Sequence, residues 1–189
     1  MSLFLCTHRW TKTKPVSTAN SIHVFTDGSF SSATPTVGGI GVYFPDQQYA
    51  DISESFNDKP TNQRAELLAV LRAIQTVRHE NKTSTIEIHT DSKYAIGACT
   101  DWLARWRRNG WKTSKKEDVT NQDILRPLSE CLDGVVFHHV RAHTGRADNA
   151  SINNAFADKL AKDAIKNEHT SSSVHSTCVQ ANMSSSATV

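Results

Sequence analysis

The chain has 189 residues, of which 38% are hydrophobic and 21% are charged, and its formal net charge is +2. This composition is ordinary for a globular domain with one core and does not require a second domain. The small net charge excludes a uniformly basic surface, so contact with a nucleic acid would depend on local clusters of cations. The four cysteines form no CxxC pair and no regular pattern, which disfavours both a zinc site and a disulfide framework.

The sequence does not indicate insertion into a membrane. No apolar stretch approaches the ~20 residues of a membrane helix, and the opening "MSLFLC" is too short for the core of a signal peptide. We therefore expect a soluble protein of a reducing compartment, cytoplasmic or nuclear, with no membrane partner. Residues 1–20 contain three cations and no acid. They predict a disordered basic lead, and the same composition also fits a mitochondrial transit peptide.

Three apolar runs come first along the chain and are joined by turn-forming residues, at 22–27, 37–44 and about 49–56. Such runs predict an antiparallel meander of three strands. The spacing then changes, because the segment "TNQRAELLAVLRAIQTVRHE" after Pro60 has apolar residues at helical intervals. A fourth short strand is predicted at 85–90.

Helices and one more strand follow, with helical patterns at 100–108, at 120–133 and in "NNAFADKLAKDAIKN", and a strand in "GVVFHHV". Strands followed by strand and helix alternation predict an α/β fold, a mixed sheet covered by helices, within residues 21–167. The Ser- and Thr-rich residues 168–189 predict a disordered tail, because they cannot bury enough apolar surface to offset the entropy of ordering.

Four acids occur beside apolar surface in these predicted elements. Asp27, in the run "IHVFTDGSF", shares a strand face with Phe25, and Asp91 comes directly after the fourth strand. Glu66 and Asp158 lie on small, partly apolar faces of their helices. Taken singly, these acids could open a turn, cap a helix or lie at a helix edge. Together they predict a buried site for a hard cation such as Mg²⁺, which prefers oxygen ligands and offsets the repulsion among carboxylates.

Five blocks occur in order along the chain: "TDGS", "TNQRAEL", "TDSKYAI", "WLARWRRNGWKT", and "VRAHTG" with "NNAFADKLA". Their order and approximate spacing resemble those of type 1 ribonuclease H over about residues 22–166. The resemblance implies an RNase H-like fold, a five-stranded mixed sheet flanked by helices, and an endonuclease that hydrolyses the RNA strand of RNA–DNA hybrids. The implied mechanism uses two Mg²⁺ ions, with Mn²⁺ as a substitute, and leaves 5′-phosphate and 3′-hydroxyl ends.

The resemblance assigns both catalysis and metal binding to the four acids already noted, Asp27, Glu66, Asp91 and Asp158. It adds one further catalytic residue, His143, which lies in the loop motif "RAHTG". A histidine titrates near neutral pH, so His143 is expected to assist proton transfer or product release.

The spacing near the last acid departs from the family pattern. Asp158 lies fifteen positions after His143, whereas the step is about ten positions in the common bacterial form. The usual Asn-Glu pair before the last acid reads Asn154-Ala155 here. Asp148, inside the apparent insertion "RADNASIN", is therefore a rival for the fourth ligand, although the motif "ADKLA" favours Asp158.

The segment "WLARWRRNGWK" interleaves tryptophans with cations and resembles the basic protrusion with which the family grips the DNA strand. The alternative is an amphipathic helix with core tryptophans and solvated cations. The polar residues before Glu66 resemble contacts to the minor groove of the hybrid, where 2′-hydroxyls distinguish RNA from DNA. The expected substrate contacts are Gly28, Asn62, Gln63, Arg64, Lys93, Trp102, Arg105, Trp106, Arg107, Arg108, Trp111 and Lys112.

Two other functions fit the sequence less well. A non-catalytic hybrid-binding module would keep the basic segment and lose an acid, but all four acids are present. Another nuclease of the RNase H-like superfamily is disfavoured by the basic segment and by "TNQRAEL". We therefore expect an enzyme that acts on an RNA–DNA hybrid as a monomer.

Overall fold

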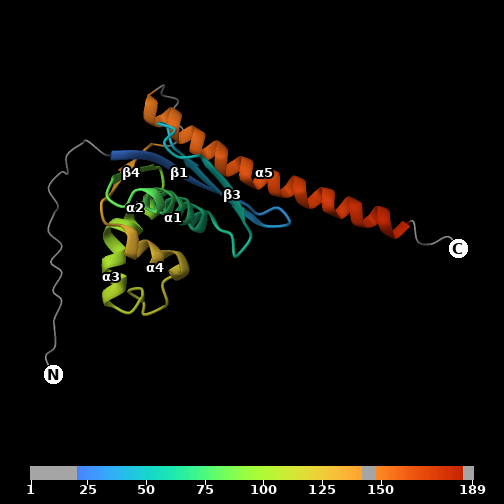
Figure 1. Ribbon diagram of the computed structural model, residues 1–189. Helices are drawn as coiled ribbons and strands as arrows, with labels where there is room; N and C mark the ends of the chain where they lie inside the picture. Colours follow the sequence, from blue (N-terminus) through green and yellow to red (C-terminus); the bar gives the residue numbers. More distant parts are fainter. Residues whose placement is uncertain (1–20, 142–147, 185–189) are drawn as a thin grey trace.

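The computed structural model describes residues 21–141 and 148–184, with side chains described up to residue 170, and its centre is a five-stranded sheet (Figure 1). The strands are β1 (Ser21–Ser31), β2 (Val37–Tyr43), β3 (Ile52–Phe56), β4 (Thr85–Thr90) and β5 (Val135–His139). Their order across the sheet is β3-β2-β1-β4-β5. The first three strands pair antiparallel, β4 pairs in parallel with β1, and β5 pairs in parallel with β4, which confirms the predicted mixed sheet.

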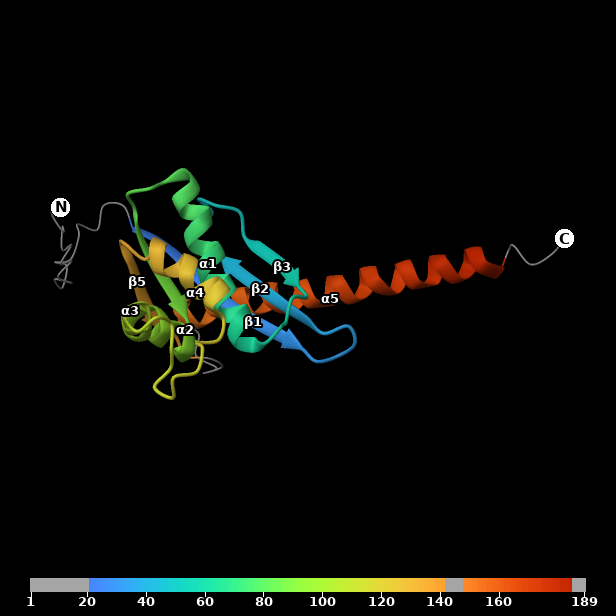
Figure 2. The same cartoon turned by 90° about the horizontal axis from the view of Figure 1, so that it is seen from below.

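Helices cover both faces of the sheet. α1 (Asn62–Glu80) and α4 (Gln122–Cys131) pack on one side, and α5 (Asn149–Ser184) packs on the other (Figure 1 and Figure 2). After β4, one helical run is made of α2 (Lys93–Gly97), a π-helical turn (Ala98–Trp102) and α3 (Leu103–Arg108). The helix predicted at 100–108 is therefore only the second half of this run.

The alternation of side chains in β1 determines which residues meet which layer. Val24 is buried in the larger core together with Leu67 of α1. Phe25 points to the other face and packs with Ala157 of α5. Because Asp27 lies two residues beyond Phe25, its side chain also lies on the α5 face of the sheet.

Two glycines of β2 allow α5 to lie directly against the sheet. A Cβ atom at Gly41 would lie 2.0 Å from the carbonyl oxygen of Ala157, and a Cβ at Gly39 would lie 2.0 Å from that of Ala161. Only glycine leaves room for this approach of two backbones. This close contact sets the distance between α5 and the strands β1 and β2, and hence the position of Asp158 on α5.

α5 is much longer than the predicted last helix. It continues to Ser184, into the segment for which the sequence predicts disorder, and Figure 1 shows this part extending away from the sheet. A helix nucleated by its packing on β2 adds one backbone hydrogen bond per residue without further apolar burial. The remaining residues of the expected tail and the expected basic lead lie outside the described residues. Among the helices of the described part, none combines the length and apolarity needed to cross a membrane.

Candidate active site

Three of the predicted metal ligands meet at one point although they belong to three parts of the chain. Asp27 lies in β1, Glu66 in α1 and Asp91 directly after β4. One carboxylate oxygen from each lies within 4.8 Å of the others. β1 and β4 are parallel neighbours with Phe25 opposite His89, so the acids two residues further on reach the same level of the sheet.

Glu66 reaches this point because α1 crosses very close to β1. A Cβ atom at Gly28 would lie 2.3 Å from the backbone nitrogen of Glu66, so a side chain at that position would push the helix away. The start of α1 is fixed by Thr61, whose hydroxyl accepts a hydrogen bond from the backbone N–H of Arg64 at 3.2 Å. Glu66 follows one turn later, on the buried side of the helix.

The structure excludes the local roles that the sequence left open for two of the acids. Asp27 does not open a turn, because β1 continues to Ser31 and Asp27 pairs with Gly41 of β2. Asp91 does not cap α2, because the cap is Ser92, whose side chain accepts a hydrogen bond from the backbone N–H of Ala95.

Burial makes the acid cluster costly to ionise. Asp27 and Glu66 are each 7% exposed. Burial raises the pKa of Asp27 to about 8, with smaller contributions from repulsion by Asp91 and Asp158. Burial likewise raises the pKa of Glu66 to about 9, with repulsion from Asp27 and Asp91 adding to the effect. A bound cation would reverse this preference by stabilising the ionised carboxylates.

The donor set fits a hard divalent cation. All three clustered side chains offer oxygen, which Mg²⁺ and related ions prefer. Within the described part of the chain, the buried Oε2 atom of Glu66 has no hydrogen-bond partner. A buried acceptor is rarely left unpaired, so this oxygen is available to a ligand.

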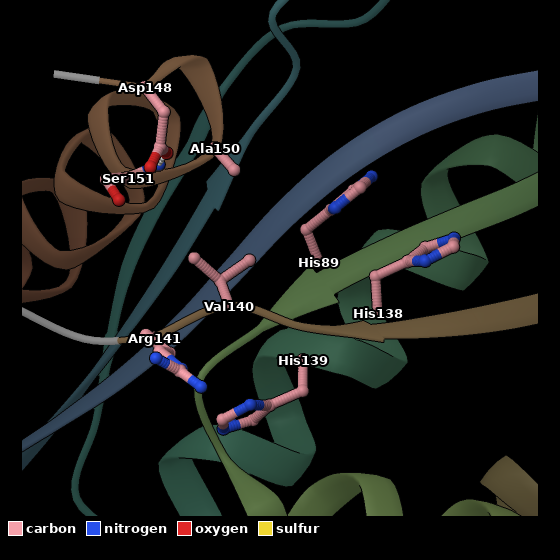
Figure 3. A pocket seen from close by; sticks show the side chains of 8 residues that line it. All are labelled: His89, His138, His139, Val140, Arg141, Asp148, Ala150 and Ser151. Carbon is pink, nitrogen blue, oxygen red and sulfur yellow. Dashed lines mark hydrogen bonds between the residues drawn. The ribbon is translucent and has the colours of Figure 1, made fainter. Parts of the chain in front are cut away.

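The fourth acid that borders the cluster is Asp158. Its negative charge contributes to the raised pKa of Asp27, and its Oδ2 accepts a hydrogen bond from Lys162 Nζ at 2.7 Å. The rival Asp148 lies at the start of α5, where its Oδ1 accepts from the backbone N–H of Ser151 at 2.8 Å (Figure 3). Asp148 therefore has the geometry of a helix cap.

Asn154 is a polar residue of this site that the sequence analysis did not assign to a role. It is buried, its Nδ2 donates to Asp91 Oδ2 at 3.4 Å, and its Oδ1 has no partner among the described residues. Asn154 precedes Asp158 by one helical turn, so both lie on the same face of α5. The four-residue spacing of Asn154 and Asp158 in "NNAFADKLA" could therefore have predicted that Asn154 lies beside the acids. His143, the other group expected near this face, lies outside the described residues.

The tryptophans of the basic segment, residues 102–112, contribute mainly to packing. Trp102 and Trp106 are half-buried, with ring centroids 5.6 Å apart. Trp111 is 8% exposed and belongs to the core, and the guanidinium of Arg126 lies 4.6 Å from its ring centroid. The ring of Trp111 is enclosed by protein in this structure, and its contact with substrate stays a prediction.

The cations of the basic segment are exposed, as a phosphate-binding surface requires. Arg107 Nη1 donates to the carbonyl oxygen of Ser129 at 3.2 Å, and Lys112 Nζ pairs with Asp118 at 2.7 Å. The exposed residues among the expected substrate contacts are Asn62, Gln63, Lys93, Arg105, Arg107, Arg108 and Lys112. Gly28 is buried, and its N–H donates to Asp27 Oδ1 at 2.9 Å.

Arg64, another expected substrate contact, is 9% exposed and engaged within the protein. Its Nη1 and Nη2 donate to the two carboxylate oxygens of Asp123 at 2.9 and 2.7 Å. This bidentate pair lowers the pKa of Asp123 and links the start of α1 to α4. Arg64 therefore holds two helices together, and a contact with substrate would require breaking the pair.

We expect Arg64→Ala to lower the free energy of unfolding by about 2 kcal/mol, because it removes two charge-assisted hydrogen bonds from a buried guanidinium. Arg72→Ala is the matched control, since Arg72 pairs with Glu54 at 2.6 Å on the surface and its loss should cost less than ~1 kcal/mol. Urea unfolding measures both. Equal losses in the two variants would contradict the role given to Arg64.

Comparison with known proteins shows the family of the chain. The family model for RNase H matches residues 19–166. A ribonuclease H from Rhizobium meliloti (strain 1021) is 33% identical over 150 residues, which cover 77% of this chain and 90% of that protein. A ribonuclease H from Thermosynechococcus vestitus (strain NIES-2133 / IAM M-273 / BP-1) is 37% identical over 129 residues, covering 67% and 80%.

Among solved structures, the foamy viral protease-reverse transcriptase in complex with an RNA/DNA hybrid has a similar fold. The TM-score is 0.66 at 22% identity, and the match covers 82% of this chain and 21% of that chain. The family match and the acid cluster together indicate a nuclease of the metal-dependent class. The chain belongs to the RNase H family. It is accordingly a hydrolase, an endonuclease that acts on RNA–DNA hybrids.

Proposed function

We propose that the hydrolysis of the RNA strand takes place at the cluster formed by Asp27, Glu66, Asp91 and Asp158. The observation that carries this proposal is the convergence of three carboxylates from β1, α1 and the end of β4, two of them buried. Ionised carboxylates this close repel one another and destabilise the fold, and a bound cation would offset that repulsion. The expected products carry 5′-phosphate and 3′-hydroxyl ends.

The residues would hold two Mg²⁺ ions, with Mn²⁺ as a substitute. When bound, such ions activate a water molecule and stabilise the leaving oxygen of the phosphodiester. The carboxylates supply negative charge and fix the direction in which their oxygens point. Asn154 orients the Asp91 carboxylate through its hydrogen bond to Oδ2. His143 is proposed, from the family resemblance, to move a proton or to promote release of the product.

The exposed cations of the basic segment are proposed to bind the DNA strand. Arg105 and Arg108 lie on the exposed side of α3, and charge on one helix face can neutralise successive phosphates. Asn62 and Gln63 are exposed in the first turn of α1, one turn before Glu66, which places amide groups near the acids for contact with the minor groove.

A cleavage assay tests the proposed function. The purified chain is incubated with a labelled RNA–DNA hybrid, duplex DNA or duplex RNA, in Mg²⁺ or in EDTA. We expect cuts in the RNA strand of the hybrid in Mg²⁺ only. Binding of the hybrid without cleavage in either Mg²⁺ or Mn²⁺ would instead support the hybrid-binding module, and cleavage of duplex DNA would support another nuclease of the superfamily.

We expect the double variant Arg105→Glu/Arg108→Glu to bind the hybrid at least about tenfold more weakly at low salt. The slope of log affinity against log salt should fall by up to about two units, because each lost phosphate contact removes somewhat less than one unit. The control Lys82→Glu/Lys166→Glu makes the same change of charge at exposed cations away from the basic segment. Similar hybrid affinities of the two double variants would show that Arg105 and Arg108 are solvated cations that do not contact the hybrid.

A further inference from the structure

A group of side chains of types that can bind metal ions lies on the sheet face that carries the acids. Three histidines and one glutamate come from three neighbouring strands: His23 from β1, Glu87 and His89 from β4, and His138 from β5. The strand register pairs His23 with Glu87 and pairs His89 with His138, so the four residues occupy two adjacent rows of the sheet. Because side chains two residues apart share a face, all four point to the same side.

The four side chains are already in contact as two linked pairs. Nδ1 of His23 lies 3.1 Å from Nε2 of His89, and Nε2 of His138 lies 2.5 Å from Oε2 of Glu87. The rings of His89 and His138 stack with centroids 4.7 Å apart, which joins the two pairs. Figure 3 shows these two rings side by side on neighbouring strands.

We propose that His23, Glu87, His89 and His138 form a binding site for a transition-metal dication of the Zn²⁺ class. Zinc binds imidazole nitrogen at about 2.0–2.1 Å, so two ligand atoms in a tetrahedral site lie roughly 3.3 Å apart. The distance between the nitrogens of His23 and His89 is close to this value. The ligand atoms of the four residues do not meet at one point in this structure, so binding requires the His138 ring to rotate away from Glu87 and both side chains to turn toward the ion.

The donor set distinguishes this site from the acid cluster. Imidazole nitrogens favour Zn²⁺, Co²⁺, Ni²⁺ or Cu²⁺, whereas sites made only of carboxylate oxygens favour Mg²⁺ or Mn²⁺. The two sites are close, because Asp91 follows His89 by two residues, a step of roughly 7 Å along a strand. A protein in excess Mg²⁺ would therefore fill the acids with Mg²⁺ and leave the histidines to a softer ion.

An ion can enter this site from solvent. The side chain of His138 is 43% exposed, and His23 is exposed at the surface of β1. His89 and His138 also line a hollow of about 350 Å³ between the ends of β5 and α5. Substitution of the exposed histidines should therefore leave the core of the protein unchanged.

Titration calorimetry of the full chain with Zn²⁺ in excess Mg²⁺ tests the proposal. We expect one Zn²⁺ per chain, and we expect His23→Gln and His138→Gln each to weaken the affinity by about tenfold or more. His79→Gln is the matched control, since His79 is exposed in α1 and far along the chain from the four residues. Its affinity should equal that of the wild type.

A second measurement does not depend on variants. Co²⁺ in a four-coordinate site with nitrogen donors absorbs visible light strongly, whereas Co²⁺ bound by six oxygen donors absorbs weakly. We expect the strong spectrum for the wild type in excess Mg²⁺ and its loss on addition of Zn²⁺. Absence of Zn²⁺ binding in excess Mg²⁺, or an affinity unchanged in both variants, would overturn the proposal, as would a weak Co²⁺ spectrum. None of these readouts depends on nuclease activity.

Discussion

Asp91→Asn is expected to abolish cleavage of an RNA–DNA hybrid and to leave the affinity for the hybrid intact. The substitution keeps the size of the side chain and an oxygen that can still accept from Asn154 Nδ2. It removes one negative charge from a cluster whose oxygens lie within 4.8 Å of one another. Loss of a ligand that acts only together with the others should lower the single-turnover rate by roughly 10³-fold or more at saturating Mg²⁺.

The matched control is Asp148→Asn, which removes the same charge from the rival acid. Asparagine is as good a helix cap as aspartate, so this variant should keep its fold and cleave at the wild-type rate. Hybrid affinity is measured by filter binding in Ca²⁺ or EDTA, and rates are measured in Mg²⁺. Substantial Mg²⁺-dependent turnover by Asp91→Asn, or a comparable loss of cleavage rate in Asp148→Asn, would contradict the assignment of the metal-binding acids.

Asp27→Asn is expected to stabilise the metal-free protein at alkaline pH. The pKa of Asp27 is raised to about 8 in the fold from its ordinary value of 3.8, mainly by burial. A raised pKa means that the folded state favours the protonated acid, so stability falls as the pH rises from about 4 to about 8 and stays low above that range. Asparagine mimics the protonated form and can still accept the hydrogen bond of the Gly28 N–H.

The expected gain is several degrees in melting temperature. One pKa unit corresponds to about 1.4 kcal/mol, and 1 kcal/mol shifts the melting temperature of a chain of this size by about 2–4 °C. The pKa of Asp27 is raised by several units, and repulsion between Asp27 and Glu66 also raises the pKa of Glu66. Asp27→Asn should therefore raise the melting temperature by about 5 °C or more at pH 9 in EDTA. The gain should shrink at pH 5, where Asp27 is protonated in the wild type.

Calorimetry in EDTA and in Mg²⁺ checks this prediction. Mg²⁺ should reverse the order, because the wild type gains stability by binding it and Asp27→Asn loses a ligand. The control Asp163→Asn removes a partly exposed acid of α5 that pairs with Lys159 at 2.7 Å, so it should not stabilise at any pH. A lower melting temperature of Asp27→Asn at pH 9 in EDTA would show that the cluster is not under repulsion.

The sequence predicted the part of the site that depends on local periodicity. Alternation in β1 placed Asp27 on a face with Phe25, and the end of an apolar run placed Asp91 at the edge of the sheet. The parallel pairing of β1 with β4 then brings both acids to one level. The placement of each acid on its own element depends on residues close in the chain, so local periodicity is sufficient to predict it.

Contacts between distant segments could not be predicted in this way. Arg64 belongs to a motif that resembles substrate-contacting residues, but its partner Asp123 lies 59 residues further along the chain. Trp111 is enclosed because α4 packs beside it, with Arg126 over its ring. Neither contact can be recognised from the residues that neighbour Arg64 or Trp111 in the sequence. The length of α5 was underestimated for another reason, since composition measures apolar burial and not the propagation of helical hydrogen bonds.

The position of α5 in the chain gives the site an order of assembly during synthesis. β1, α1 and β4 leave the ribosome first, and they already contain the three clustered acids. α5 is made after them; it supplies Asp158 and Asn154 and packs on Phe25 and on the glycines of β2. A nascent chain that has not yet reached α5 therefore lacks two residues of the proposed site, although its three clustered acids have already been made.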